Sequence, residues 1–320
     1  MKLARQLGIT PLPRSISAVM SPVRRFRALG FPFRAPSTPR GVEPVHELSS
    51  TGARYDTSWA RRTPARMARA AIVDGPMKLA VSTLAAPELR GRDHLLDLDG
   101  PAIFAANHHS HLDTPLMLTS IPDQWRHKIV VGAAADYFFS TRLTSALSSL
   151  TIGAIPIERT KVGRRSADLA AELLDDGWSL LLFPEGGRSP DGWGQPFRGG
   201  AAYLAKRCGV PVVPVHIEGT SRILRKGKSM PRPSTTSVTL GRPIRPSESD
   251  NANRFAARIE AEIAALADEA SSDWYQARIR AHAGQSPSLT GPSAGSWRRS
   301  WALGDRSRRA KTRTRSWPEL

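Results

Sequence analysis

A histidine and an aspartate that stand five positions apart, His108 and Asp113, are the first residues whose types and spacing suit catalysis. An imidazole that donates one ring N–H to a carboxylate is held in one tautomer, and the carboxylate stabilises the imidazolium that forms when the ring takes a proton. We predict that His108 is a general base and that Asp113 orients it. Two alternatives stay open. The pair could cap a strand and a helix, or His108, His109 and His111 could hold a metal, although no cysteine or acidic cluster accompanies them.

The residues around this pair predict a strand, a tight loop and the start of a helix. An apolar run at 101–106 precedes the pair, and Thr114 and Pro115 follow Asp113 directly. Thr114 can serve as the N-cap, and Pro115 suits the first helical position because its missing N–H would have no partner there. We therefore expect Asp113 to be free of capping, just outside the positive end of the helix.

Three further segments lie downstream of this motif. They read Gly-Ala-Ile-Pro-Ile-Glu-Arg-Thr at 153–160, Phe-Pro-Glu-Gly-Gly-Arg-Ser at 183–189 and Val-Pro-Val-Val-Pro-Val at 210–215. Together with Asn-His-His-Ser-His-Leu-Asp at 107–113, the sequence resembles the four blocks of the glycerolipid acyltransferase family, of the PlsC-like 1-acylglycerol-3-phosphate O-acyltransferase type. Each block alone is weak, but the four occur in order and at ordinary spacings over about 101–220.

The resemblance implies an O-acyltransferase. Such an enzyme moves a fatty acyl group from acyl-CoA or acyl-carrier protein to a lysophospholipid hydroxyl, here most directly from 1-acylglycerol-3-phosphate to phosphatidic acid. The thioester is then a co-substrate, and no cofactor or metal is expected. Another acceptor remains open within the class, such as glycerol-3-phosphate, a different lysophospholipid or a glycolipid. Outside the class, the alternatives are a metal-dependent hydrolase and a non-catalytic protein that binds lipid or nucleic acid.

Substrate-binding residues follow from the later blocks. A phosphate on the acceptor calls for a fixed cation, and Arg159 stands at the place of the second block's arginine, whose planar guanidinium pairs with phosphate oxygens. The alternative for Arg159 is a surface ion pair with Glu158. Pro214 in the fourth block resembles the proline associated with the acyl-donor side, although it could equally shape a strand.

The third block supplies the other predicted contacts. Glu185 and Arg188 flank two glycines, whose lack of side chains lets backbone N–H groups approach a ligand. The resemblance assigns Glu185 and Gly186 to acceptor binding. Gly187 replaces the threonine that is usual there, so the acceptor can differ from that of relatives. Arg198, just before the next predicted helix, is a further candidate for phosphate.

Apolar runs alternate with helical patterns through the body of the chain. This alternation predicts an α/β fold with a largely parallel or mixed central sheet flanked by helices and preceded by N-terminal amphipathic helices. Catalytic residues gather at the carboxyl ends of such strands, as the positions of His108, Arg159 and Glu185 require. The predicted strands are 95–98, 102–106, 128–133, 151–157, 179–183, 212–217 and 237–240, and the predicted helices are 115–119, 135–148, 165–175, 200–208 and 253–270.

The charge divides the chain into a neutral body and basic ends. Residues 91–273 hold 21 basic and 21 acidic side chains, so the whole net charge of +18 lies outside them. We expect a disordered basic Pro/Arg-rich segment at 1–57, an amphipathic helical membrane-association segment at 58–90, an acyltransferase domain at 91–273, and a disordered Trp/Arg tail at 274–320. Removing this tail should weaken membrane binding and preserve turnover. An anionic membrane surface is the expected partner, since no nucleic-acid-binding signature accompanies the tail.

The sequence also bears on location. Cys208 is the one cysteine, and no run approaches the roughly 20 apolar residues that cross a bilayer. No secretory signal is recognisable. We expect a cytoplasmic protein that lies on the inner face of the cell membrane. At 58–90, Gly75-Pro76 should split the helical pattern into two short helices, either a membrane-resting hairpin or a core-packing pair.

Overall fold

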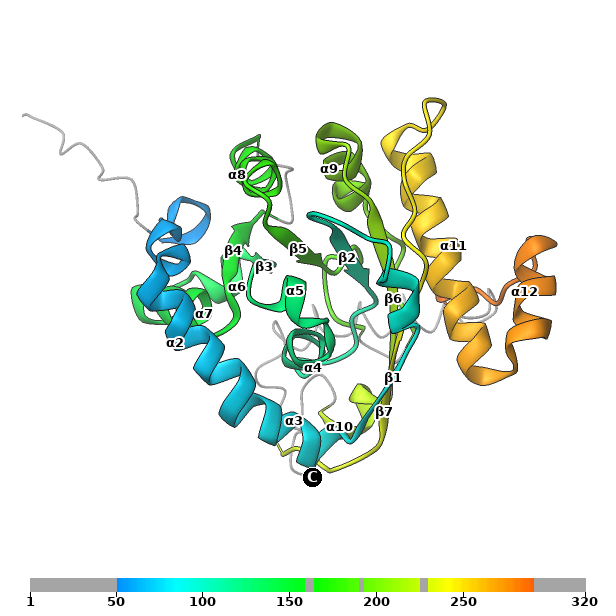
Figure 1. Ribbon diagram of the computed structural model, residues 1–320, viewed down its shortest axis with the longest axis horizontal. Helices are drawn as coiled ribbons and strands as arrows, with labels where there is room; N and C mark the ends of the chain where they lie inside the picture. The colour runs from blue at the N-terminus through cyan, green and yellow to red at the C-terminus, as the bar shows by residue number, and fades with distance from the viewer. Residues whose placement is uncertain (1–50, 159–163, 190–192, 225–229, 291–320) are drawn as a thin grey trace, which may run out of the picture. The chain divides into compact units, whose positions relative to one another are not determined.

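The computed structural model describes residues 51–158, 164–189, 193–224 and 230–290, which belong to one compact unit, Ser49–Leu320. A seven-stranded sheet in the order β1-β7-β6-β2-β5-β3-β4 forms its centre (Figure 1). β6 and β7 pair antiparallel, whereas all other neighbours are parallel, which confirms the predicted α/β fold with a mixed sheet. The strands are β1 (Pro87–Arg90), β2 (Ile103–Ala106), β3 (Ile129–Ala134), β4 (Ala154–Ile157), β5 (Ser179–Leu182), β6 (Val212–Glu218) and β7 (Thr236–Leu240).

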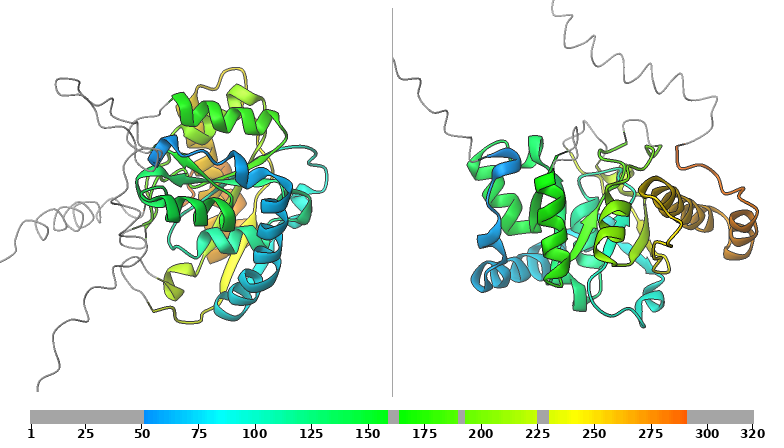
Figure 2. Two further views of the ribbon diagram at one scale, coloured as in Figure 1. Left: turned by 90° about the vertical axis from the view of Figure 1, so that its left-hand side faces the viewer. Right: turned by 90° about the horizontal axis from the view of Figure 1, so that it is seen from above.

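Helices cover both faces of the sheet (Figures 1 and 2). α8, α9 and α11 pack on one face, and α3, α4 and α5 pack on the other. α7 packs beside β4 and against α2. The helices are α2 (Thr63–Ile72), α3 (Lys78–Ala85), α4 (Asp113–Ser120), α5 (Asp123–Arg126), α6 (Ala135–Phe138), α7 (Arg142–Ile152), α8 (Arg164–Asp175), α9 (Gly200–Cys208), α10 (Thr220–Ile223), α11 (Ala252–Ser271) and α12 (Trp274–His282).

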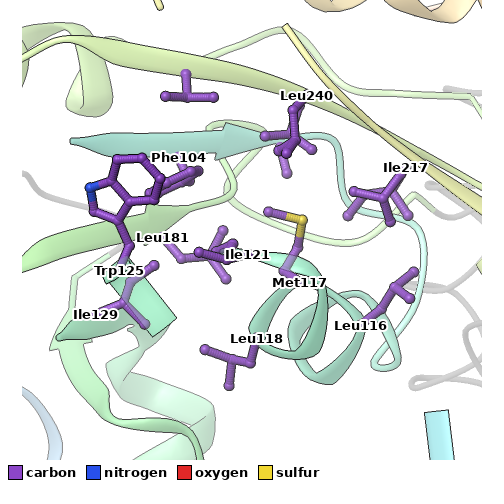
Figure 3. Close-up of a cluster of buried hydrophobic side chains, with 14 of the residues drawn as sticks. Phe104, Leu116, Met117, Leu118, Ile121, Trp125, Ile129, Leu181, Ile217 and Leu240 are labelled. Atoms are coloured by element: carbon purple, nitrogen blue, oxygen red, sulfur yellow. The ribbon is translucent and has the colours of Figure 1, made fainter. Parts of the chain in front are cut away.

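The centre of the sheet is buried on both faces. Along β2 successive side chains point to opposite faces, so Ile103 packs with α9 and α11 while Phe104 packs with α4 and α5. Met117 points from α4 toward the sheet, and the Trp125 ring lies edge-on to Phe104 at 5.9 Å between centroids (Figure 3). Burial of each such side chain contributes on the order of 1.5–3 kcal/mol, which fixes the strand that ends at the predicted catalytic histidine.

The N-terminal helices differ from the prediction. Gly75-Pro76 does not divide them into a hairpin, because the π-helical turn Val73–Met77 joins α2 and α3 into one bent rod (Figure 1). A proline inside a regular helix lacks an N–H and clashes with the carbonyl four residues earlier, and the wider turn accommodates it. The rod is anchored by Arg69, a buried side chain whose Nε donates to the carbonyl of Leu150 in α7 at 3.1 Å.

Two local predictions are wrong next to this rod. The helical segment predicted at 58–90 is too long, because α3 ends at Ala85 and β1 begins at Pro87. β1 pairs only with β7 at the edge of the sheet, so its short polar sequence carries little strand signal. The predicted strand at 95–98 is also absent, since Arg92–Leu95 form a 3-10 turn. Similarly, α7 continues to Ile152, so β4 begins later than predicted.

The beginning of the predicted tail is structured. Asp273 caps α12 by accepting the Gln276 N–H at 2.9 Å, so the disordered segment expected from residue 274 does not start there. The rest of that tail, at 291–320, lies outside the described residues, as do residues 1–50 of the predicted N-terminal segment. Within the described ranges, no helix combines the length and apolarity needed to cross a bilayer.

Candidate active site

The candidate site lies where β2 and β5 end. These strands are parallel neighbours, so the residues that follow them, Asn107-His108 and Phe183-Pro184-Glu185, meet at one edge of the sheet. Asn107 fixes the first segment, because its side chain donates to the Ile217 carbonyl at 2.8 Å and accepts the Ile217 N–H at 2.7 Å. Asn107 is not among the residues predicted from the sequence to be functional. The available signal is an asparagine directly after a central apolar strand.

His108 and Asp113 lie in contact, as predicted from their spacing. The Nδ1 atom of His108 is 2.9 Å from Oδ2 of Asp113, whose side chain is fully buried. The same Oδ2 accepts the N–H groups of His109 at 2.7 Å and Ser110 at 2.8 Å. The predicted Thr114 cap is wrong, since α4 begins at Asp113 itself. One carboxylate oxygen therefore closes the loop and orients the imidazole.

The His108 imidazole is held by a ring-stacking contact as well as by the hydrogen bond to Asp113. The His108 ring stacks on Phe183 with centroids 4.1 Å apart, and its side chain is 17% exposed. Because Nδ1 faces Asp113, Nε2 is the nitrogen that can meet a substrate. The nearby Ser110 hydroxyl donates to the Leu224 carbonyl at 2.8 Å, so this serine serves the loop and does not face His108 as a nucleophile would.

Glu185 lies beneath the histidine loop. Its Oε1 accepts the His108 N–H at 2.8 Å, and its Oε2 accepts the Gln195 N–H at 2.9 Å. Burial raises the pKa of this carboxyl to about 7, although both N–H groups act in the opposite direction. Both oxygens are thus bound to the main chain. The contact of Glu185 with an acceptor stays a prediction, while the two hydrogen bonds tie its side chain to the main chain of His108 and Gln195.

The glycines after Glu185 permit a close packing. Gly186 has φ +68°, and a Cβ there would lie 2.8 Å from Nε of Arg198. Arg198, predicted as a phosphate contact, therefore packs behind this turn. Gly187 has more room, since the nearest atom to its Cβ position is the Gln195 side chain at 3.9 Å. A β-carbon would therefore fit at this position.

A groove of about 540 Å³ opens beside His108. Its walls come from the start of α4, from β3, α6 and α7, from the ends of β4 and β5, and from residues 186–188. Most lining side chains are apolar, while Arg188, His111 and Tyr137 bring polar groups to it. Burial, followed by the nearby Arg188 cation, lowers the pKa of His111. The groove is therefore an apolar channel with a second histidine and a cation near His108 and Asp113.

Arg159 and Pro214 complete the set of predicted substrate-binding residues. Arg159 lies outside the described residues. Pro214 is buried within β6, pairs with Ala105 of β2, and does not line the groove. Among the residues that the structure describes, no group of three or more His, Cys, Asp or Glu side chains is arranged to hold a metal ion.

Comparisons with known proteins agree with this arrangement. A family model described as Acyltransferase matches residues 86–218. The 1-acyl-sn-glycerol-3-phosphate acyltransferase BAT2 of Brassica napus is 31% identical over 167 residues, which are 51% of this chain and 46% of the relative. The 1-acyl-sn-glycerol-3-phosphate acyltransferase alpha of Mus musculus is 30% identical over 131 residues, which are 40% of this chain and 44% of the relative. The chain thus spans less than half the length of these curated relatives.

A solved structure shares the fold. The 1-acyl-sn-glycerophosphate acyltransferase PlsC from Thermotoga maritima aligns with a TM-score of 0.52 at 22% identity, over 69% of this chain and 85% of that chain. The residues matched by the family model, 86–218, run from β1 to β6 and include His108, Asp113 and Glu185. Over residues 86–218 the chain is therefore similar to the acyltransferase family, and it shares its fold with PlsC.

Proposed function

We propose that this protein transfers a fatty acyl group from an acyl thioester to the hydroxyl of a lysophospholipid, and that 1-acylglycerol-3-phosphate is the acceptor. One observation carries the proposal. A histidine held by a buried carboxylate lines an apolar groove, with its second ring nitrogen left for a substrate. The relatives named above are 1-acylglycerol-3-phosphate acyltransferases, which supports this acceptor. The donor, acyl-CoA or acyl-carrier protein, remains a prediction.

The reaction follows from the positions of the two side chains. Nε2 of His108 takes the acceptor's hydroxyl proton while the acceptor oxygen attacks the thioester carbonyl. The tetrahedral intermediate then collapses, the C–S bond breaks, and the leaving thiolate takes the proton from the imidazolium. Asp113 stabilises that imidazolium and keeps Nδ1 protonated in the neutral ring. No covalent enzyme intermediate is needed.

Cations near His108 can bind the acceptor phosphate. Arg188 lines the groove beside His111, and its guanidinium suits bidentate contact with phosphate oxygens. Arg159 stays a prediction for the same role. Glu185 acts differently, since it holds the His108 main chain from below. A protonated Glu185 would lose charge at this contact, so its ionised form is the one that supports the loop best.

The apolar part of the groove suits the fatty chain. It passes Gly132 in β3, where a Cβ would lie 2.4 Å from the Leu182 side chain, and it reaches Ser148 and Thr151 on α7. Hydrocarbon binding in such a channel is favourable by roughly 0.8 kcal/mol for each buried CH₂. The length of the channel should therefore select among acyl chains.

A bulky side chain in this channel should shift chain-length preference. We expect Ser148→Phe to lower kcat/KM for long-chain donors relative to short-chain donors by about 10-fold or more, because the ring excludes several methylenes. Leu147→Phe on the same helix is the matched control, since Leu147 is 51% exposed and does not line the groove. Competition assays with mixed acyl-CoA chain lengths measure the ratio. If the ratio of long-chain to short-chain kcat/KM were equal in the two variants, the fatty acyl chain would bind outside this channel.

We further propose that the acceptor is met at an anionic membrane surface, with the protein on the cytoplasmic face of the cell membrane. The basic residues outside 91–273 support an anionic partner, because each Lys or Arg near such a surface contributes about 1 kcal/mol. α2 carries exposed Arg66 and Met67, a pairing that suits a lipid interface.

Product analysis tests the proposed function. Purified protein should convert 1-acylglycerol-3-phosphate and acyl-CoA into phosphatidic acid, detected by mass spectrometry, in preference to other lysophospholipids, glycerol-3-phosphate and glycolipids. If only another acceptor were acylated, the proposed reaction would stand but the proposed acceptor would be wrong. Release of free fatty acid without any acylated product would overturn the transferase and favour a hydrolase.

A further inference from the structure

The loop that holds Glu185 is itself held by residues far along the chain. Gln195, which donates its N–H to Glu185, follows Gly194, whose N–H donates to the Leu289 carbonyl at 2.9 Å. On the other side, the Phe197 N–H donates to Oε2 of Glu260 in α11 at 3.1 Å. Both anchors lie beyond residue 218, where the family match ends. The described site is therefore completed by the C-terminal region.

The contact between Gly194 and Leu289 is a close one. A Cβ on Gly194 would lie 3.2 Å from the Leu289 carbonyl oxygen and 3.4 Å from its Cβ, so glycine permits this approach. The Leu289 side chain is half-buried and packs, together with Phe197, on the cluster beneath α8, α9 and α11. The main-chain hydrogen bond is thus supported by apolar packing on the same residue.

α12 brings Leu289 to this position. Arg280 in α12 donates from Nε and Nη2 to the buried Asp268 of α11, at 2.6 and 2.8 Å. The chain reverses after α12 at Gly284, which has φ +67°, and the Gln285 N–H donates to the Arg280 carbonyl at 2.7 Å. Residues 283–290, here called the return segment, then run back to the loop. The bidentate ion pair fixes α12, from which the return segment starts, and Leu289 fixes the far end of the segment.

We propose that the return segment is a positioning element of the acyl-transfer site, which acts through Gly194, Gln195 and Glu185 on the main chain of His108. This inference rests on the proposed function, and it assigns a role to residues outside the matched family domain. It also replaces the expectation that removal of everything after residue 273 preserves turnover.

The effect of losing this contact follows from the order of the hydrogen bonds. Without Leu289, Gly194 and Gln195 lose their fixed place, and among the described residues Glu185 keeps the His108 N–H as its one main-chain donor. A displacement of about 1 Å at a catalytic group is enough to cost roughly 100-fold in rate. Loss of the Gln195 N–H also favours the protonated carboxyl, which raises the pKa of Glu185 further.

Variants of the full-length chain test the role of the return segment. Leu289→Asp should expel the side chain from its packing, whereas Ser288→Asp places the same charge on an exposed neighbour and Leu289→Met conserves the packing. We expect amide hydrogen exchange at Gly194, Gln195 and His108 to accelerate about 10-fold or more in Leu289→Asp and to stay at the parent's rate in both controls. Gly194→Val, which crowds Leu289 from the loop side, should reproduce this pattern.

Kinetics supply an independent readout. We expect kcat per folded molecule to fall about 10- to 100-fold in Leu289→Asp, with little change in KM. The acid limb of its pH–rate profile should move to higher pH, whereas neither control should show this shift. Parental exchange at the three amides would overturn the proposal, as would a loss of activity that only follows the unfolded fraction. Absence of transfer in the parent would refute the proposed function, while the exchange rates would still decide the role of the return segment.

Discussion

Replacement of His108 by alanine should lower kcat for acyl transfer by about 10³- to 10⁴-fold, because the acceptor hydroxyl then has no base aligned with it. The fold should persist. β2 is fixed by buried neighbours and by the Asn107 bridge to Ile217, and the lost imidazole contributes mainly its stacking on Phe183. Initial rates with radiolabelled acyl-CoA measure the effect, with circular dichroism and urea denaturation as checks on folding.

Two other histidines serve as controls for this experiment. His127→Ala removes a ring that is 41% exposed and pairs with Asp74, and it should leave kcat unchanged. His111→Ala removes the second imidazole of the groove and should affect acceptor KM more than kcat, since Arg188 stands beside it. If His111→Ala abolished transfer and His108→Ala preserved it, the base would be His111.

Asp113→Asn is expected to lower kcat by about 10²- to 10⁴-fold with a smaller loss of stability. The amide oxygen can still accept the N–H groups of His109 and Ser110, but a neutral side chain cannot stabilise the imidazolium of His108. Asp113→Ala should add a loss of stability of about 1–3 kcal/mol for each donor left without a partner. Urea denaturation and kcat together separate the two effects.

A carboxylate away from the site provides the comparison for Asp113. Asp123 is 79% exposed and pairs with Arg126 on α5, so Asp123→Asn should change neither kcat nor stability by much. Retention of more than about a tenth of the parent's kcat by Asp113→Asn would show that the aspartate only closes the loop, and His108 would then act without an electrostatic partner.

The sequence predicts the parts of this site that depend on short-range order. The His108–Asp113 contact follows from five positions of chain between a strand end and a helix start. The meeting of His108 with Glu185 follows from parallel strands that end at one edge. In both cases a regular element limits where the side chains can lie, so spacing alone is informative.

Other features depend on contacts that no local pattern carries. The role of Glu185 is set by the Gln195 N–H and, through Gly194, by Leu289, which stands about a hundred positions away. β1 depends on pairing with β7, since its own four residues alternate only weakly in burial. The joining of α2 and α3 depends on a π-helical turn, and the dipeptide Gly75-Pro76 does not predict such a turn.

The location of β2 has a thermal consequence. It is the fourth of seven strands, buried throughout, so its hydrogen bonds open only when most of the sheet does. Part of the groove wall comes instead from peripheral β4 and from α7, where partial fraying requires less free energy. As the temperature rises, selectivity among acyl chains should therefore be lost before acyl-transfer activity. The two properties should decline at different temperatures.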